Sequence, residues 1–264
     1  MAKYRRFKTS EQLMEQGRPN FHPQRVFPRY ASVVRASSRL PVGISLTQRA
    51  LGKFILDPFV SFSENPRPED LQRTKIGICG FPRTGTTFLL KAVDIYIGRP
   101  GSGWKNHDPY TIRDFNAVSV PAIVTLRDPG DACISWAIYH GDAPSVSGLN
   151  HRLSLFIAWH RVMLREARRS PVVFAEFIDF TRSPLTLLSQ LCPSGQASPR
   201  RDEVMKAVQQ DNALDSRNER MANMPSPRRD ALKQEYLSLL EQRSVMRNLK
   251  TAKEILNALR ASRP

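Results

Sequence analysis

The sequence predicts an α/β domain in which a parallel sheet carries helices on both faces. Three short apolar runs, 75–80, 121–126 and 171–175, have the length and composition of buried strands. The first two runs are each followed at once by a polar turn and a helical stretch. Strands that alternate with helices in this way pair in parallel, and helices cover both faces of the sheet.

Residues 1–70 precede this pattern and are predicted to form an irregular, basic N-terminal extension. They are rich in Arg, Ser and Pro, hold one periodic stretch at about 47–60, and end in the linker-like run 65–70. Their aromatic and aliphatic residues are too many for a free tail. We therefore expect the extension to pack on the main domain, which takes residues 71–264.

The helices are predicted from periodicity and turn signals. One is expected at about 85–97, and another after the turn 128–131, with Asp131 as its cap, through about residue 139. A longer amphipathic helix is expected over 149–168. Its apolar side would carry Leu153, Phe156, Ile157, His160, Met163 and Leu164. Helices are expected to fill most of the remaining chain to residue 259.

The composition indicates an anionic partner without naming it. The chain has 40 Lys and Arg residues against 24 Asp and Glu residues, a net charge of +16. The excess is spread along the chain, which makes a nucleic-acid arm unlikely. Three distant cysteines argue against a disulfide framework or a paired-cysteine zinc site. No apolar run reaches the roughly 18 to 20 residues of a membrane span, so the expected location is cytoplasmic.

The loop after the first apolar run has the spacing of a phosphate-binding loop. Gly80 and Gly85 form a G-x4-G pattern between a strand and a helix N-terminus, where backbone N–H groups and the helix dipole favour an anion. Thr86 stands where a Walker A loop has its lysine, and the cation of this loop is Arg83. The loop therefore suits one phosphate or phosphosulfate better than a metal-bound triphosphate. Spacing alone leaves a purely structural connection equally open.

The run FPRTGTT at 81–87 resembles the 5′-phosphosulfate loop of the PAPS-dependent sulfotransferases, P-[KR]-[ST]-G-T-T. The resemblance implies a three-layer, P-loop NTPase-like fold. It also implies that the loop holds the 5′-phosphosulfate of 3′-phosphoadenosine 5′-phosphosulfate (PAPS) through Arg83, Thr84, Gly85, Thr86 and Thr87. Phe88 falls where many cytosolic members carry a tryptophan that stacks on adenine.

A second segment, 124–136, is similar to the family's 3′-phosphate motif, R-[ND]-P-x-D-x-x-[VI]-S. Arg127 would leave the strand end as a permanent fork donor, and Ser135, about two helical turns on, would aim its hydroxyl at the same phosphate. A looser third match covers 175–184, so the resemblance spans about 74–192.

The family's glycine-rich, basic C-terminal segment is not visible in this chain. The nearest basic stretches are 217–220 and 227–229, both without the glycines. We interpret each as a solvated helix edge, with phosphate contact as the less favoured alternative.

The segment 103–109, between the two phosphate motifs, supplies the candidate base. Its K-x-H pattern is similar to the K-[TS]-H segment of cytosolic sulfotransferases. By that resemblance His107 accepts the proton of the acceptor, while Lys105 and Arg83 hold the transferring sulfuryl oxygens. A lone histidine is more often a packing or surface residue, so His140 is a second candidate and Asp108 a third.

The sequence thus predicts a sulfotransferase that moves a sulfuryl group from PAPS to a hydroxyl or amine, without a metal. The acceptor class is open among small molecules, glycans and peptides, and the basic surface would suit an acidic one. One alternative is a P-loop nucleotide or nucleoside kinase. Another is a non-catalytic anion- or nucleic-acid-binding protein on the same fold. The oligomeric state is open.

Overall fold

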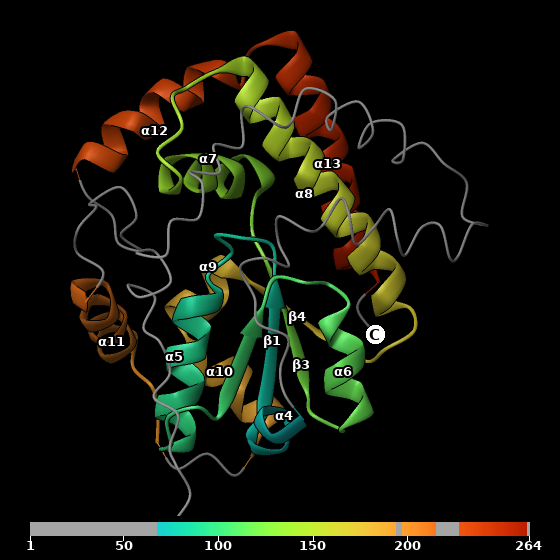
Figure 1. Ribbon diagram of the computed structural model, residues 1–264, viewed down its shortest axis with the longest axis vertical. Coiled ribbons are helices and arrows are strands. Elements are labelled where there is room, and N and C mark those ends of the chain that lie inside the picture. The colour runs from blue at the N-terminus through green and yellow to red at the C-terminus, as the bar shows by residue number, and fades with distance from the viewer. Residues whose placement is uncertain (1–67, 194–196, 215–226, 263–264) are drawn as a thin grey trace, which may run out of the picture.

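The computed structural model describes residues 68–193, 197–214 and 227–262 (Figure 1). Its centre is a parallel sheet whose four strands have the order β2-β1-β3-β4. The strands are β1 (Ile76–Gly80), β2 (Gly103–Asn106), β3 (Ala122–Leu126) and β4 (Val173–Glu176). The predicted α/β class and parallel sheet are therefore confirmed. The predicted extension up to residue 67, including its periodic stretch, lies outside the described residues.

Helices flank both faces of the sheet, and each face has its own apolar core. On one side lie α5 (Thr86–Ile97), α9 (Phe177–Arg182), α10 (Pro184–Leu191) and α11 (Arg201–Leu214). The other core is built with α6 (Thr111–Ala117), α7 (Pro129–Tyr139), α8 (Val146–Ala167), α12 (Pro227–Leu239) and α13 (Arg243–Ala261). Along β1, Ile76 and Ile78 enter the first core and Cys79 enters the second, as the two-residue period of a strand requires.

Figure 1 shows α7 and α12 above the carboxyl ends of the strands, while α5 and α6 flank the sheet. In that position α7 and α12 can form the wall opposite the loops that leave β1 and β3. Within the described part of the chain, no helix is long and apolar enough to cross a membrane.

Three short elements were not predicted. The run expected to be a linker ends in a helix, α4 (Pro68–Arg73), while α6 and β2 lie in a stretch with no apolar period. Strand β2 is at the sheet edge, and its exposed Lys105 gives it no continuous apolar pattern. An edge strand pairs with one neighbour and has one side open, so it can carry polar residues such as lysine. Its composition therefore does not mark it as a strand.

Two helix starts also differ from the prediction because the capping residues lie earlier. Asp128, not Asp131, caps α7: its carboxylate accepts a hydrogen bond from the Asp131 N–H at 3.1 Å. Asp131 instead pairs with Lys233 at 3.1 Å. Ser145 caps α8 and moves its first residue to Val146, ahead of the predicted position 149.

The β1–α5 loop is fixed by close packing. Gly85 has a φ of 89°, and a Cβ there would lie 2.7 Å from the Phe177 ring and 2.8 Å from the Phe180 ring. The fully buried Thr84 hydroxyl donates to the Phe81 carbonyl at 2.6 Å and lies 2.7 Å from the Thr125 hydroxyl. The loop is thereby tied to β3 on one side and to α9 on the other.

We predict that Gly85→Ala lowers the free energy of unfolding by about 2 to 5 kcal/mol. A left-handed backbone costs a residue with a Cβ about 1 to 2 kcal/mol, and overpacking against two rings costs about 1 to 3 kcal/mol more. Gly101→Ala is the matched control, because Gly101 has a φ of 77° with no atom within 4 Å of the added Cβ. Urea unfolding compares the two variants, and equal losses would contradict the packing argument.

Candidate active site

A cavity of about 620 Å³ opens at the carboxyl edge of the sheet, below α7 and α12. Its walls come from the β1–α5 loop, the end of β2, the β3–α7 connection and helices α7, α9, α11 and α12. Ligands of open α/β sheets bind outside the carboxyl ends of the strands, and sites for small molecules commonly have about this volume. The loops that carry both predicted phosphate motifs thus face one cavity.

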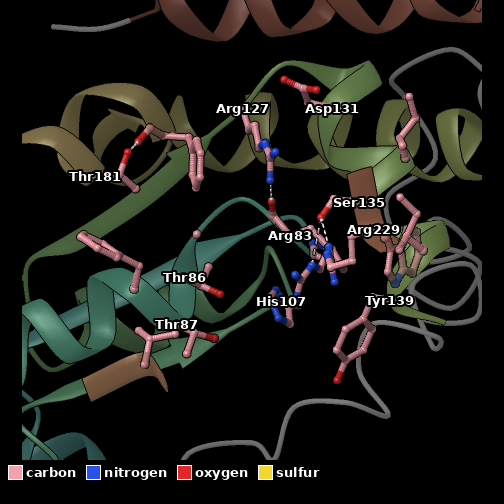
Figure 2. A pocket seen from close by; sticks show the side chains of 18 of the residues that line it. Arg83, Thr86, Thr87, His107, Arg127, Asp131, Ser135, Tyr139, Thr181 and Arg229 are labelled. Atoms are coloured by element: carbon pink, nitrogen blue, oxygen red, sulfur yellow. Dashed lines mark hydrogen bonds between the residues drawn. The ribbon is translucent and has the colours of Figure 1, made fainter. Parts of the chain in front are cut away.

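Two arginines, Arg83 and Arg229, meet at Ser135 on this cavity, and a third, Arg127, contacts the backbone of Arg83 (Figure 2). The Arg83 Nε donates to the Ser135 Oγ at 3.3 Å, and the Arg229 Nη2 donates to the same oxygen at 3.4 Å. Arg127 donates from its Nη1 to the Arg83 carbonyl at 2.8 Å. We call Arg83, Arg127 and Arg229 the arginine cluster. Because Arg83 adopts a φ of 68°, unusual for a residue other than glycine, the cluster depends on a strained loop.

The arginine cluster is electrostatically strained. Burial, followed by the Arg229 and Arg127 charges, lowers the pKa of Arg83 to about 10. Burial is also the main cause that lowers the pKa of Arg127 and of Arg229. The Arg127 Nε is buried and has no hydrogen-bond partner among the described residues. Like charges gathered in a partly desolvated site indicate a place for a bound anion.

The lining of the cavity carries an excess of positive charge. Among the described side chains that line it, six are basic and two are acidic. The basic ones are Arg83, Lys105, Arg127, Arg201, Arg229 and Lys233, and the acidic ones are Asp131 and Asp230. Asp131 pairs with Lys233 on the α7–α12 side and also attracts Arg127, so it offsets part of the positive charge of the arginine cluster.

His107 lies beside the arginine cluster, where β2 ends. Its Nδ1 is 2.6 Å from the Gly80 carbonyl oxygen, which can only accept, so Nδ1 carries the proton and Nε2 keeps a lone pair. The Trp159 indole donates to the His107 carbonyl at 2.6 Å and holds the backbone. Burial, with smaller effects from Lys105 and Arg83, lowers the pKa of His107 to about 4. The imidazole is therefore neutral at physiological pH and can accept a proton at Nε2.

Lys105 and Thr87 connect the end of β2 with the start of α5. The Lys105 Nζ donates to the Thr87 Oγ1 at 2.8 Å, and both side chains line the cavity. This contact brings the ammonium group toward the N-terminus of α5, whose free N–H groups also favour an anion. Figure 2 shows Thr86, Thr87 and His107 along the same side of the cavity.

The structure brings most of the predicted site residues to this cavity. The lining includes Arg83, Gly85, Thr86, Thr87, Phe88, Lys105, His107, Arg127 and Ser135. Thr84 is not among them, because its buried hydroxyl is hydrogen-bonded to the Phe81 carbonyl and to the Thr125 hydroxyl. Phe88 reaches the lining but is mostly buried against Phe180, with 6.2 Å between ring centroids. Of the two alternative candidate bases, His140 lines the cavity. Asp108 is not among the lining residues, and its carboxylate accepts a hydrogen bond from the Tyr110 N–H at 3.0 Å.

Two residues of the site were missed. Arg229 belongs to the stretch interpreted as a helix edge, and a residue 94 positions after Ser135 gives no sequence signal of contact with it. Tyr139 lies one turn after Ser135 on α7, and its ring centroid is 4.8 Å from the Arg83 guanidinium carbon. That i+4 spacing from Ser135 could have indicated Tyr139.

The sequence matches no family model, and no curated protein is significantly similar to it.

We predict opposite effects of Arg229→Gln on stability and on anion binding. Without an anion, the loss of like-charge repulsion should raise the free energy of unfolding by up to about 1 kcal/mol. Stabilisation by added pyrophosphate should fall at the same time, because one donor to the anion is gone. Arg228→Gln is the matched control: Arg228 is the exposed neighbour and does not line the cavity.

Urea unfolding with and without pyrophosphate measures both quantities. Arg228→Gln should change each by less than about 0.5 kcal/mol, as surface substitutions usually do. A less stable Arg229→Gln protein with unchanged pyrophosphate stabilisation would show that Arg229 has a structural role only.

Proposed function

We propose that the protein is a sulfotransferase that uses PAPS as the donor, on a P-loop NTPase-like fold. One observation carries the proposal: a strained arginine cluster and a neutral histidine with a free Nε2 line the same cavity at the carboxyl edge of a parallel sheet. Such a cavity offers anion recognition and a proton acceptor side by side. The resemblance of the loops 81–87 and 124–136 to the PAPS-binding motifs supports the same donor.

The donor has anionic groups at two positions, and we divide the polar groups of the cavity between them, with Arg83 at the boundary because it also donates to Ser135. The N-terminus of α5, Arg83 and Lys105 would hold the 5′-phosphosulfate. Arg127, Ser135 and Arg229 would hold the 3′-phosphate. In this proposal Arg229 supplies a contact for which the sequence showed no motif.

Sulfuryl transfer then requires little from the protein beyond position and charge. The acceptor oxygen or nitrogen forms a bond to sulfur as the bond from sulfur to the 5′-phosphate oxygen breaks, and 3′-phosphoadenosine 5′-phosphate (PAP) leaves with that electron pair. The acceptor proton passes to His107 Nε2. Arg83 and Lys105 stabilise the charge on the sulfuryl oxygens.

The geometry gives less support to a nucleotide kinase. Thr86, in place of the Walker lysine, is the first residue of α5 and is only 4% exposed. Asp128, the carboxylate that follows β3, serves as the cap of α7. A nucleic-acid-binding protein is also less well supported, because six of the described basic residues line one cavity, which suits a small anionic ligand.

We predict that PAP stabilises the protein against heat without Mg²⁺, and more than ATP does. The 3′-phosphate should account for a large part of the shift, so adenosine 5′-phosphosulfate should stabilise less. Arg127→Gln and Ser135→Ala should reduce this preference for the 3′-phosphate. Thermal unfolding with each nucleotide measures this preference. A larger increase in melting temperature with Mg-ATP than with PAP would contradict the proposal.

We predict that His107→Ala lowers kcat for transfer from labelled PAPS by about 10² to 10⁴, the usual contribution of a general base. The affinity for PAP should change by less than about threefold, because the proposal assigns the phosphate contacts to other residues than His107. Since the pKa of His107 is lowered to about 4, activity should stay level from pH 8 down to about 5 and fall as His107 gains a proton.

A panel of phenols, alcohols, amines, sugars and peptides serves as acceptors, with His140→Ala as the matched control. Full activity of His107→Ala together with an inactive His140→Ala would transfer the role of base to His140.

A further inference from the structure

A second cavity, of about 430 Å³, lies next to the candidate active site along the edge strand β2. Its walls are the end of α4, one side of α5, the loop between α5 and β2, and the first residues of β2. Lys105 lines this cavity as well as the larger one. The two cavities are therefore neighbouring parts of one surface, which we call the β2 groove where it is lined by Arg73, Leu90, 99–101 and 103–105.

The β2 groove is positively charged. Arg73, Arg99 and Lys105 are its basic residues, and no acidic residue is among the described residues that line it. Arg73 is the last residue of α4, Arg99 follows the end of α5, and both are exposed. Two guanidinium groups from separate helix ends, converging on one groove, suit a negatively charged group on the ligand.

The β2 groove also presents a flat apolar surface. The Trp104 side chain is partly exposed and lines the groove, while its indole nitrogen is buried without a partner among the described residues. The exposed part of the indole is thus its apolar ring. Gly101 has open space where a Cβ would be, so the groove is wide beside this ring. An aromatic ring that lines a groove together with cations fits a ligand that has both a ring face and a negative charge.

The β2 groove and the candidate base are separated along one strand. From Trp104 to His107 the chain advances three residues, or about 10 Å at the rise of a β-strand. A single sugar ring cannot bridge this separation, whereas a short chain of rings can. The groove and the active site therefore suit different units of one extended molecule.

We propose that the β2 groove binds an acidic sugar unit of an oligosaccharide acceptor, one or more units away from the hydroxyl that reaches His107. The inference rests on the proposed function, because it assigns the acceptor of that site. An acidic peptide would satisfy the arginines but would bring no ring face to Trp104. The combination of Arg73, Arg99 and the indole favours the acidic sugar.

The test uses the full chain and a sulfated, uronate-containing hexasaccharide derived from heparin as the probe, in buffer near 0.15 M salt, where distant charges are screened. Trp104 fluorescence reports occupation of the groove, and the Trp104→Phe variant separates this signal from that of Trp136, which lines the larger cavity. The double variant Arg73→Ala/Arg99→Ala should bind the hexasaccharide at least about tenfold more weakly, as expected for the loss of charged hydrogen bonds. Its PAP-induced thermal shift should be unchanged.

The matched control is Arg168→Ala/Arg169→Ala, which removes the same charge from exposed positions at the end of α8. It should weaken hexasaccharide binding by less than about twofold, as surface charges far from a site do. Trp104→Phe should abolish the fluorescence change and weaken binding in a filter assay. Equal losses in the two double variants would show attraction to the net charge alone and would overturn the proposal.

Three further outcomes overturn parts of the proposal separately. Hexaglutamate binding as tight as that of the hexasaccharide, with the same dependence on Arg73 and Arg99, would make the ligand a peptide. If the groove variants have no effect while PAP binds normally, the groove fails and the sulfotransferase proposal stands. If the groove variants weaken binding but PAP does not bind, the sugar site stands and its role as an acceptor site fails.

Discussion

The gathering of Arg83, Arg127 and Arg229 between the β1–α5 loop and Ser135 is the constraint on which the rest of the site depends. These three arginines repel one another in a partly desolvated cavity, and nearby carboxylates such as Asp131 and Asp230 offset this only in part, because burial still lowers the pKa of each arginine. The fold holds them there because Arg83 lies in a strained loop that Gly85 packs against α9. A bound anion would relieve this repulsion, and we therefore expect the cluster to favour anion binding.

The same loop links anion recognition to the candidate base. Gly80 ends β1, starts the loop and accepts the hydrogen bond of the His107 Nδ1. Trp159, from the middle of α8, holds the His107 carbonyl from the opposite side. The tautomer that leaves Nε2 able to accept a proton is thus fixed by the sheet and by the helix layer. Position, charge and proton acceptance all depend on how β1 and β2 end at one edge.

Much of this site could be predicted from the sequence because its parts are local. Apolar runs predicted β1 and β3 to within one residue and predicted β4 about two residues early. A polar motif directly follows β1 and β3, and these motifs pointed to Arg83, Arg127 and Ser135. What failed depends on long-range contacts. Arg229 is 94 residues from its partner Ser135. The Thr84 hydroxyl is hydrogen-bonded to the Thr125 hydroxyl on β3 and therefore does not face the cavity. The edge strand β2 has no apolar period. Local patterns specify neither the partner of a side chain nor which strand is at an edge.

A crystal structure of the protein with PAP, grown without a divalent metal, tests the central claim most directly. We predict the 5′-phosphate at the N-terminus of α5, in reach of Arg83 and Lys105, and the 3′-phosphate between Ser135, Arg127 and Arg229. The His107 Nε2 should face the open side of the 5′-phosphate, where an acceptor would enter. PAP bound outside this cavity, or bound in it with the arginine cluster untouched, would contradict the account.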